Sequence, residues 1–261
     1  MVVQHNLTAM NSNRMLGITT KSQASTTEKL SSGYKINRAA DDSAGLSISE
    51  KMRRQIRGLS QASTNAQDGV SLVQSAEGAL TEVTDMLQRM NELTVKAANG
   101  TYTSTQRQYI ADEINQLVSE IDRVATTTRF NDQKVLSAAG TYCFQVGNEC
   151  GETLSVQISG MKASSINANL TTQNWSSTAG SVANSFFAVV KSSLEKVASQ
   201  RSILGAVQNR LDHTINNLDK IRIFIFFSNI YNFYYAKNMH FNAHSNPNMS
   251  VPADISFIRT S

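Results

Sequence analysis

The amino-acid sequence predicts a mainly α-helical protein: a long antiparallel bundle or coiled-coil rod that carries a small β-hairpin. Three observations predict this fold class. Both prolines, Pro247 and Pro252, lie beyond residue 240, so no proline interrupts a helix before residue 220. Apolar residues recur at alternating spacings of three and four in several stretches. One short stretch, residues 141–158, instead combines β-prone residues with a glycine-containing turn.

Three apolar stripes account for the predicted bundle. The first two are separated by a break at Asn99 and Gly100, where a helix is expected to end, so their helices are expected to pack antiparallel. A third stripe has the same period, and the three together can bury one another. The stripes consist of Val73, Ala76, Leu80, Val83, Leu87 and Met90; of Ile110, Ile114, Leu117, Ile121 and Val124; and of Val190, Leu194, Val197, Leu204, Val207, Leu211, Ile215 and Leu218.

The opening stretch, residues 7–30, has a weaker pattern. Leu7, Met10, Leu16 and Ile18 are apolar, but serine and threonine dominate the rest. Because such side chains compete for backbone hydrogen bonds, this segment is expected to become helical only against a partner.

The residues between the second and third stripes predict a hairpin and a loop. Gly147 and Asn148 suit a type II′ turn, which would pair Gln145 with Cys150 and leave Cys143 out of register. A strain-free disulfide is therefore disfavoured, and two partly buried thiols are expected, with a cross-link outside the cell left open. Residues 160–185, which contain Trp175, are interpreted as a short surface connection.

Composition and motifs argue against several functional classes. The 24 basic and 20 acidic residues are interspersed, so the charge pattern of a nucleic-acid-binding protein is missing. Two cysteines exclude a four-cysteine zinc site, and four scattered histidines make a histidine metal centre improbable. The sequence has no GxxxxGK[ST], HExxH, GxSxG or GxGxxG pattern. We therefore expect that the protein is not an enzyme and that it binds neither a cofactor nor a metal.

A resemblance to the bacterial flagellins begins at residues 30–59, which read LSSGYKINRAADDSAGLSISEKMRRQIRGL. It continues through NAQDG at 65–69, AEGAL at 76–80, LQRMNELTVKAANGTYT at 87–103, ADEINQLVSEIDRVA at 111–125, RFN at 129–131 and FQVG at 144–147. It resumes with SQRSILGAVQNRLDHTINNLD at 199–219. The resemblance covers roughly 200 of the 261 positions, which is long and specific for a motif match.

The resemblance implies an inner coiled coil, which pairs an N-terminal with a C-terminal helix, and an outer helical rod with a hairpin. Residues 1–40 would form the inner segment used in export and polymerisation, and residues 41–159 the N-terminal rod domain. Residues 160–185 would replace the variable outer domains, and residues 186–220 would begin the C-terminal helical region. Residues 221–261 would be an aromatic tail foreign to the family, either disordered or aberrant.

The function implied by the resemblance is that of a structural subunit of the flagellar filament. Such subunits leave the cell through the flagellar type III export system without signal cleavage, and residues 1–11 show no cleavable signal pattern. The expected location is extracellular, in the filament. The expected partners are other flagellin subunits, as a homopolymer, and the export apparatus. No nucleic acid or membrane partner is expected.

Two groups of residues match sites of the family. Arg89, Leu93 and Glu113 correspond to the surface read by the Toll-like receptor that detects flagellin, and the predicted helix pair allows them to cluster. A signature for subunit contacts and for the bend between layers comprises Ala39, Ala40, Asp41, Asp42, Gly45 and Leu46. From the residues alone, Asp41 and Asp42 are expected in a turn or at a helix start, because no third ligand or base lies nearby.

The resemblance ends after Asp219, and the rest of the sequence admits three explanations. It is a frameshifted or truncated gene product, a membrane-interacting segment at residues 221–236, or a specialised partner-binding tail. Without the family's C-terminal helix, the export chaperone would lose its site and the chain is expected to assemble poorly. The alternative function is a secreted or membrane-associated helical interaction protein with a flagellin-derived body.

Overall fold

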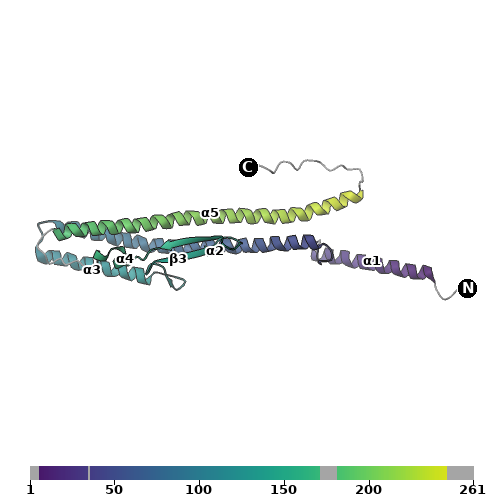
Figure 1. Cartoon of the computed structure of the whole chain (residues 1–261), viewed down its shortest axis with the longest axis horizontal. Helices are drawn as coiled ribbons and strands as arrows, with labels where there is room; N and C mark the ends of the chain where they lie inside the picture. The colour runs from purple at the N-terminus through teal and green to yellow at the C-terminus, as the bar shows by residue number, and fades with distance from the viewer. Residues whose placement is uncertain (1–5, 35, 171–180, 246–261) are drawn as a thin grey trace. The chain divides into compact units, whose positions relative to one another are not determined.

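A computed structural model describes residues 6–34, 36–170 and 181–245 of the chain. The chain divides into two units, Met1–Arg57 with Arg222–Ser261, and Gly58–Ile221. Trp175 and residues 246–261 lie outside the described part, as does the stretch from 171 to 180 of the predicted connection. The mainly helical class and the small hairpin are confirmed, and Figure 1 shows the order of the elements.

The first unit contains the helix α1 (Leu7–Ser32). Asn6 caps its start by accepting a hydrogen bond from the amide of Ala9, and Gly33 ends it in the left-handed conformation at φ 72°. The hydroxyls of Thr19, Thr20 and Thr26 donate to carbonyls one turn earlier; the helix has no buried residue. The segment that the sequence marks as weakly helical is thus a helix whose side chains face solvent.

The helix α2 (Ser43–Ala98) carries the first apolar stripe, and all six of its predicted residues are fully buried. After the turn at Asn99, a capping box formed by Thr103 and Gln106 starts α3 (Ser104–Thr127). Arg107 of α3 donates to the carbonyl oxygens of Ala97 and Asn99, so α3 satisfies carbonyls at the end of α2. The predicted break between two antiparallel helices is confirmed.

The second stripe is buried at three of its five predicted positions, Ile110, Ile114 and Ile121. Leu117 and Val124 are only partly buried, whereas Val118 and Ala125 lie in the core. The third stripe, in α5 (Ser181–Ser245), is mostly buried as predicted, but Leu194 and Ile215 lie at its edge. Two polar residues are buried in this seam: Ser193, next to the predicted Leu194, and Gln200, in the gap between Val197 and Leu204.

Four short strands follow α3. The strands β1 (Arg129–Phe130) and β2 (Gln133–Lys134) form a small antiparallel pair around Asn131 and Asp132, which both have positive φ. The strands β3 (Gly140–Gln145) and β4 (Thr153–Ile158) form the predicted hairpin. Its register pairs Gln145 with Thr153, not with Cys150, so the two-residue turn was wrong and residues 146–152 form a longer loop.

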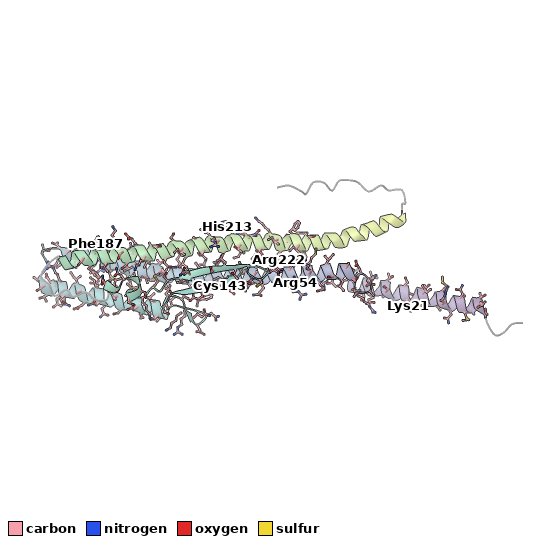
Figure 2. All side chains as sticks on the ribbon, viewed as in Figure 1. Lys21, Arg54, Cys143, Phe187, His213 and Arg222 are labelled. Carbon is pink, nitrogen blue, oxygen red and sulfur yellow. The ribbon has the colours of Figure 1, made fainter. Side chains whose placement is uncertain are left out.

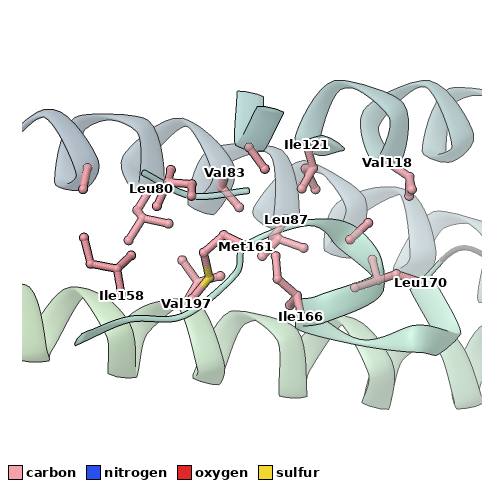
Figure 3. Packing of buried hydrophobic residues seen from close by; sticks show 14 of the residues in the cluster. Leu80, Val83, Leu87, Val118, Ile121, Ile158, Met161, Ile166, Leu170 and Val197 are labelled. Carbon is pink, nitrogen blue, oxygen red and sulfur yellow. The ribbon is translucent and has the colours of Figure 1, made fainter. Parts of the chain in front are cut away.

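The stretch after the hairpin is part of the core. It contains the helical turns α4 (Ala163–Ile166) and η1 (Ala168–Leu170), and its buried residues are Met161, Ala163, Ile166 and Leu170. Figure 3 shows this segment between α5 and the helices α2 and α3, with Met161 near Leu87 and Val197. The interpretation of residues 160–170 as a surface connection is therefore wrong, because their apolar residues close a gap between helices.

Candidate assembly interface

The first candidate surface is α1, because its apolar side chains have no partner in the described structure. Leu16 is 66% exposed, and the others are similarly exposed: Leu7, Met10, Met15, Ile18 and Leu30. Figure 2 shows side chains standing outward from α1, with Lys21 labelled among them. An exposed apolar set of this size on one helix indicates a surface for another protein chain.

The second candidate is the elbow, which we define as residues 33–34 and 36–42 between α1 and α2. Asp42 caps α2, since its Oδ1 accepts from the amide of Gly45 at 2.9 Å. The Oδ2 of Asp41 accepts from the amides of Asn37 and Arg38, both at 3.3 Å. The predicted turn and helix-start roles of the two aspartates are thus confirmed.

Ion pairs tie the elbow back to the end of α1. Lys29 lies 3.6 Å from Asp41, and the Nε of Arg38 donates to Glu28 at 3.1 Å. Asn37 adds bonds from its side-chain amide to Ser32 Oγ and to the Glu28 carbonyl. The angle between α1 and the elbow is therefore held by charged groups at the surface, which salt screens.

The pKa of the Asp41 carboxyl is lowered, first by the Asn37 and Arg38 amides and then by Lys29. A carboxyl whose pKa is depressed in the folded state contributes stability above its unfolded pKa, about 3.9 for aspartate. That contribution is lost as pH falls through the depressed value. The elbow is accordingly held at neutral pH and loosened in strong acid.

The remaining residues of the predicted contact signature surround these caps. Ala39 and Ala40 are exposed in the turn, and Gly45 and Leu46 are half-buried in the first turn of α2. A Cβ at Gly45 would lie 3.0 Å from Ile36 Cδ1 and would overlap the Asp42 carboxylate. Glycine therefore leaves room for the cap.

The predicted receptor surface is only partly formed. The guanidinium of Arg89 on α2 donates to Glu113 of α3 at 2.9 and 3.1 Å and to Glu92 at 3.1 Å. These acids raise the pKa of Arg89, Glu113 most strongly. Leu93 is only 2% exposed, so its prediction as a surface residue is wrong: four residues from Arg89, it faces the core instead.

The hairpin is held along one face of α2. Asn65 donates its side-chain amide to the Gln145 carbonyl at 3.1 Å, and a Cβ at Gly58 would overlap the side chain of Asn148. At Gly69 a Cβ would lie 3.3 Å from both Phe144 and Leu211. No periodic pattern marks these three α2 residues, so their contacts with the hairpin could not be predicted from apolar spacing.

The two cysteines are free and exposed, so the expectation of partly buried thiols was wrong. Cys143 lies in β3 opposite Ser155 and is labelled in Figure 2, whereas Cys150 belongs to the hairpin loop. Among the described residues, no group of three or more His, Cys, Asp or Glu side chains is placed to hold a metal ion.

The aromatic tail continues α5 as a helix to Ser245, which differs from the expectation of a disordered segment. Its exposed side chains include Ile223, Phe224, Phe226 and Phe227. In the part of the chain that is described, no helix combines the length and the apolar content needed to cross a bilayer.

Comparisons with known proteins agree with the sequence resemblance. A family model described as the bacterial flagellin N-terminal helical region matches residues 3–141, and one described as the C-terminal helical region matches residues 187–226. The second match extends past Asp219, so the resemblance ends later than expected.

Individual relatives cover most of the chain. A flagellin of Halalkalibacterium halodurans is 48% identical over 84% of this chain and 80% of its own length. A flagellin of Bacillus subtilis is 43% identical over 84% and 82%. The crystal structure of Bacillus cereus flagellin is similar with a TM-score of 0.52 and 28% identity, covering 59% of this chain and 88% of that one.

Proposed function

We propose that α1 and the elbow carry the contacts of this chain with neighbouring subunits. The proposal starts from the family: the chain belongs to the bacterial flagellins and is a structural subunit of the flagellar filament. The observation that supports this role most directly is that a helix of 26 residues buries none of its side chains. The family is a structural one, and no catalytic role is proposed.

The physical argument concerns the stability of α1. An isolated helix of this composition is marginal in water, since its serines and threonines compete with the helical backbone. Covering Leu16 and its apolar neighbours would add roughly 25 cal/mol per Å² of apolar area removed from water. Contact with other subunits therefore orders α1 and drives assembly by the same burial.

The tail affects the same contacts. In the expected inner coiled coil, α1 packs against a C-terminal helix, but the C-terminal family match ends at residue 226. The exposed side chains around that point are large and apolar, and two of them, Phe226 and Phe227, are in edge-to-face contact. We infer that this tail replaces the usual partner of α1 poorly, so that the chain polymerises inefficiently by itself.

A chimera tests both parts of the proposal. Residues 221–261 would be replaced by the corresponding C-terminal segment of the Halalkalibacterium halodurans flagellin, and polymers would be measured by electron microscopy and sedimentation. The original chain should give few or no filaments, whereas the chimera should polymerise. Leu16→Glu in the chimera should abolish filaments without changing the unfolding of Gly58–Ile221, because Leu16 lies outside that unit.

The outcomes separate the two claims. Filaments formed by the original chain would contradict the assembly defect but support the subunit function. A folded chimera that forms no filaments would contradict the role of α1 proposed above. In that case, flotation of the original chain with liposomes would favour the alternative, a membrane-associated helical protein with a flagellin-derived body.

We also propose that the chain is exported by the flagellar type III apparatus to the extracellular filament, and that the Arg89 and Glu113 surface contacts the host Toll-like receptor for flagellin. The receptor proposal is supported by the family resemblance and by the exposed ion pair between α2 and α3. Leu93 has no part in it, since the residue is buried.

Charge reversal tests the receptor surface. Arg89→Glu places three carboxylates together and should lower receptor activation severalfold in reporter cells. Arg123→Glu is the matched control, because Arg123 makes an exposed ion pair with Glu120 within α3. The free energy of unfolding of both variants should stay within about 0.5 kcal/mol of that of the original chain, as is usual for surface substitutions. Equal effects of the two variants on activation would contradict the proposal.

A further inference from the structure

The turn between α2 and α3 contains the single Asn–Gly pair of the sequence, Asn99–Gly100. Both residues are exposed. The assembly contacts and the receptor surface proposed above do not use this pair.

The geometry of the turn places the Asn99 side chain beside the next peptide nitrogen. Asn99 Oδ1 accepts a hydrogen bond from the Thr101 amide at 3.3 Å. This bond closes a ring that contains both the side-chain carbonyl carbon of Asn99 and the Gly100 nitrogen, so it restricts the Asn99 side chain to conformations on the side of that nitrogen. The same bond withdraws electron density from that carbonyl and would stabilise negative charge on its oxygen during an addition.

The Gly100 nitrogen is accessible for such an addition. Hydrogen bonds in the turn are donated by the amides of Asn99, Thr101 and Tyr102, and among the described residues none is found from the Gly100 amide. A Cβ at Gly100 would meet no atom within 4 Å, so the turn has room for ring closure. Glycine also gives the backbone the freedom that a five-membered ring requires.

We propose that Asn99 is a site of spontaneous deamidation in the folded subunit, with water as the only co-reactant. The Gly100 nitrogen forms a bond to the side-chain carbonyl carbon of Asn99. The bond from that carbon to Nδ2 breaks, and the amide leaves as ammonia, which carries away the Gly100 proton. Water then opens the resulting succinimide at either carbonyl, giving aspartate or isoaspartate.

The product would change the charge of a turn that is rich in cations. Arg107 Nη2 donates to the Asn99 carbonyl at 3.2 Å, and Lys96 lies over the Tyr102 ring at 5.8 Å. A new carboxylate at residue 99 would therefore form beside two positive groups, and the isoaspartate product would lengthen the backbone between α2 and α3. Aspartate and isoaspartate would therefore accumulate at residue 99 as the protein ages.

The test incubates the folded, full-length chain at mildly alkaline pH and follows each asparagine by peptide mass spectrometry, with enzymatic detection of isoaspartate. Asn99 should deamidate well ahead of Asn115, which is exposed but lies in the middle of α3, where helical geometry keeps the next nitrogen away. Gly100→Ala, for which the structure has space, should slow the reaction by roughly tenfold, about 1.4 kcal/mol in activation free energy.

A synthetic peptide spanning residues 96–103 separates the contribution of the fold from that of the local sequence. The folded chain should react at least as fast as the peptide. A folded chain that reacts more slowly than the peptide, or that modifies Asn99 no faster than Asn115, would overturn the proposal. Circular dichroism of Gly100→Ala confirms that its slower reaction does not reflect a changed fold.

Discussion

Replacing Gly69 by leucine is expected to destabilise the unit Gly58–Ile221 by about 1–3 kcal/mol, the usual cost of overpacking a filled core. Gly69 is a buried helical residue at the point where α2, the hairpin and α5 meet. Even a Cβ there would lie 3.3 Å from Leu211 on one side and from Phe144 on the other. A larger side chain must therefore displace the hairpin or α5, because Leu211 is fully buried and Phe144 is packed against the core.

The matched control is Gly78→Ala in the same helix. Gly78 is exposed, and a Cβ there would meet no atom within 4 Å, so this change should stabilise the helix by about 0.5–1 kcal/mol. Thermal and urea unfolding of the two variants and of the original chain measure both effects. A Gly69→Leu variant as stable as the original would show that the hairpin is not packed against α2 and α5 as described.

Apolar periodicity in the sequence predicts the part of the fold that depends on helical burial. The stripe from Val73 to Met90 is buried at every predicted position because this part of α2 packs against other elements of the core. In α3, three predicted positions are buried, but at the other two Val118 and Ala125 face the core better than the larger Leu117 and Val124. Residue size alone does not show which side of a helix faces its neighbour.

Other features depend on contacts between segments far apart in the sequence. The sequence of the turns at Ala163–Leu170 is typical of a polar connection, but their few apolar residues fill the space between α3 and α5. Asp122 of α3 also accepts a hydrogen bond from the amide of Ala163, the first residue of α4, at 2.8 Å. Lys196 donates to the Ile166 carbonyl at 2.6 Å in the same region. Neither partner can be inferred from local spacing, because each pair is separated by at least 30 residues.

The same distinction applies to the residues of the candidate sites: some can be predicted from local sequence and others cannot. Capping by Asp42 follows from local sequence, and the structure confirms it. The pairing of Arg89 with Glu113 can be predicted once two antiparallel helices are predicted. The burial of Leu93 cannot, because its spacing from Arg89 fixes where the two side chains lie relative to each other but not which of them faces the core.

Gln200 is the polar residue whose replacement should be most informative. It occupies the seam of α5 and is only 4% exposed. Its Nε2 donates to the Gln157 carbonyl at 3.1 Å, and its Oε1 accepts from the Ser159 amide at 3.4 Å. These two bonds join α5 to the end of β4, and a polar pair of this kind specifies the register of neighbouring elements.

Gln200→Glu should destabilise the unit by at least about 2 kcal/mol at neutral pH, since it removes the donor to Gln157 and buries a charge. Burial raises the pKa of the new carboxyl above its ordinary value of about 4.3. A raised carboxyl pKa means that the penalty is absent below the unfolded pKa and grows as pH rises through the folded one. The stability gap between variant and original should therefore narrow as pH falls toward about 4.

Urea unfolding of Gln200→Glu and of the control Gln208→Glu, measured at several pH values, tests this prediction. Gln208 is half-buried on the same helix, and its replacement should cost less and depend less on pH. If both variants behaved alike, the bonds to Gln157 and Ser159 would contribute nothing specific. A large gap that closes in acid only for Gln200→Glu would instead identify a buried amide as the link that sets the register between hairpin and helix.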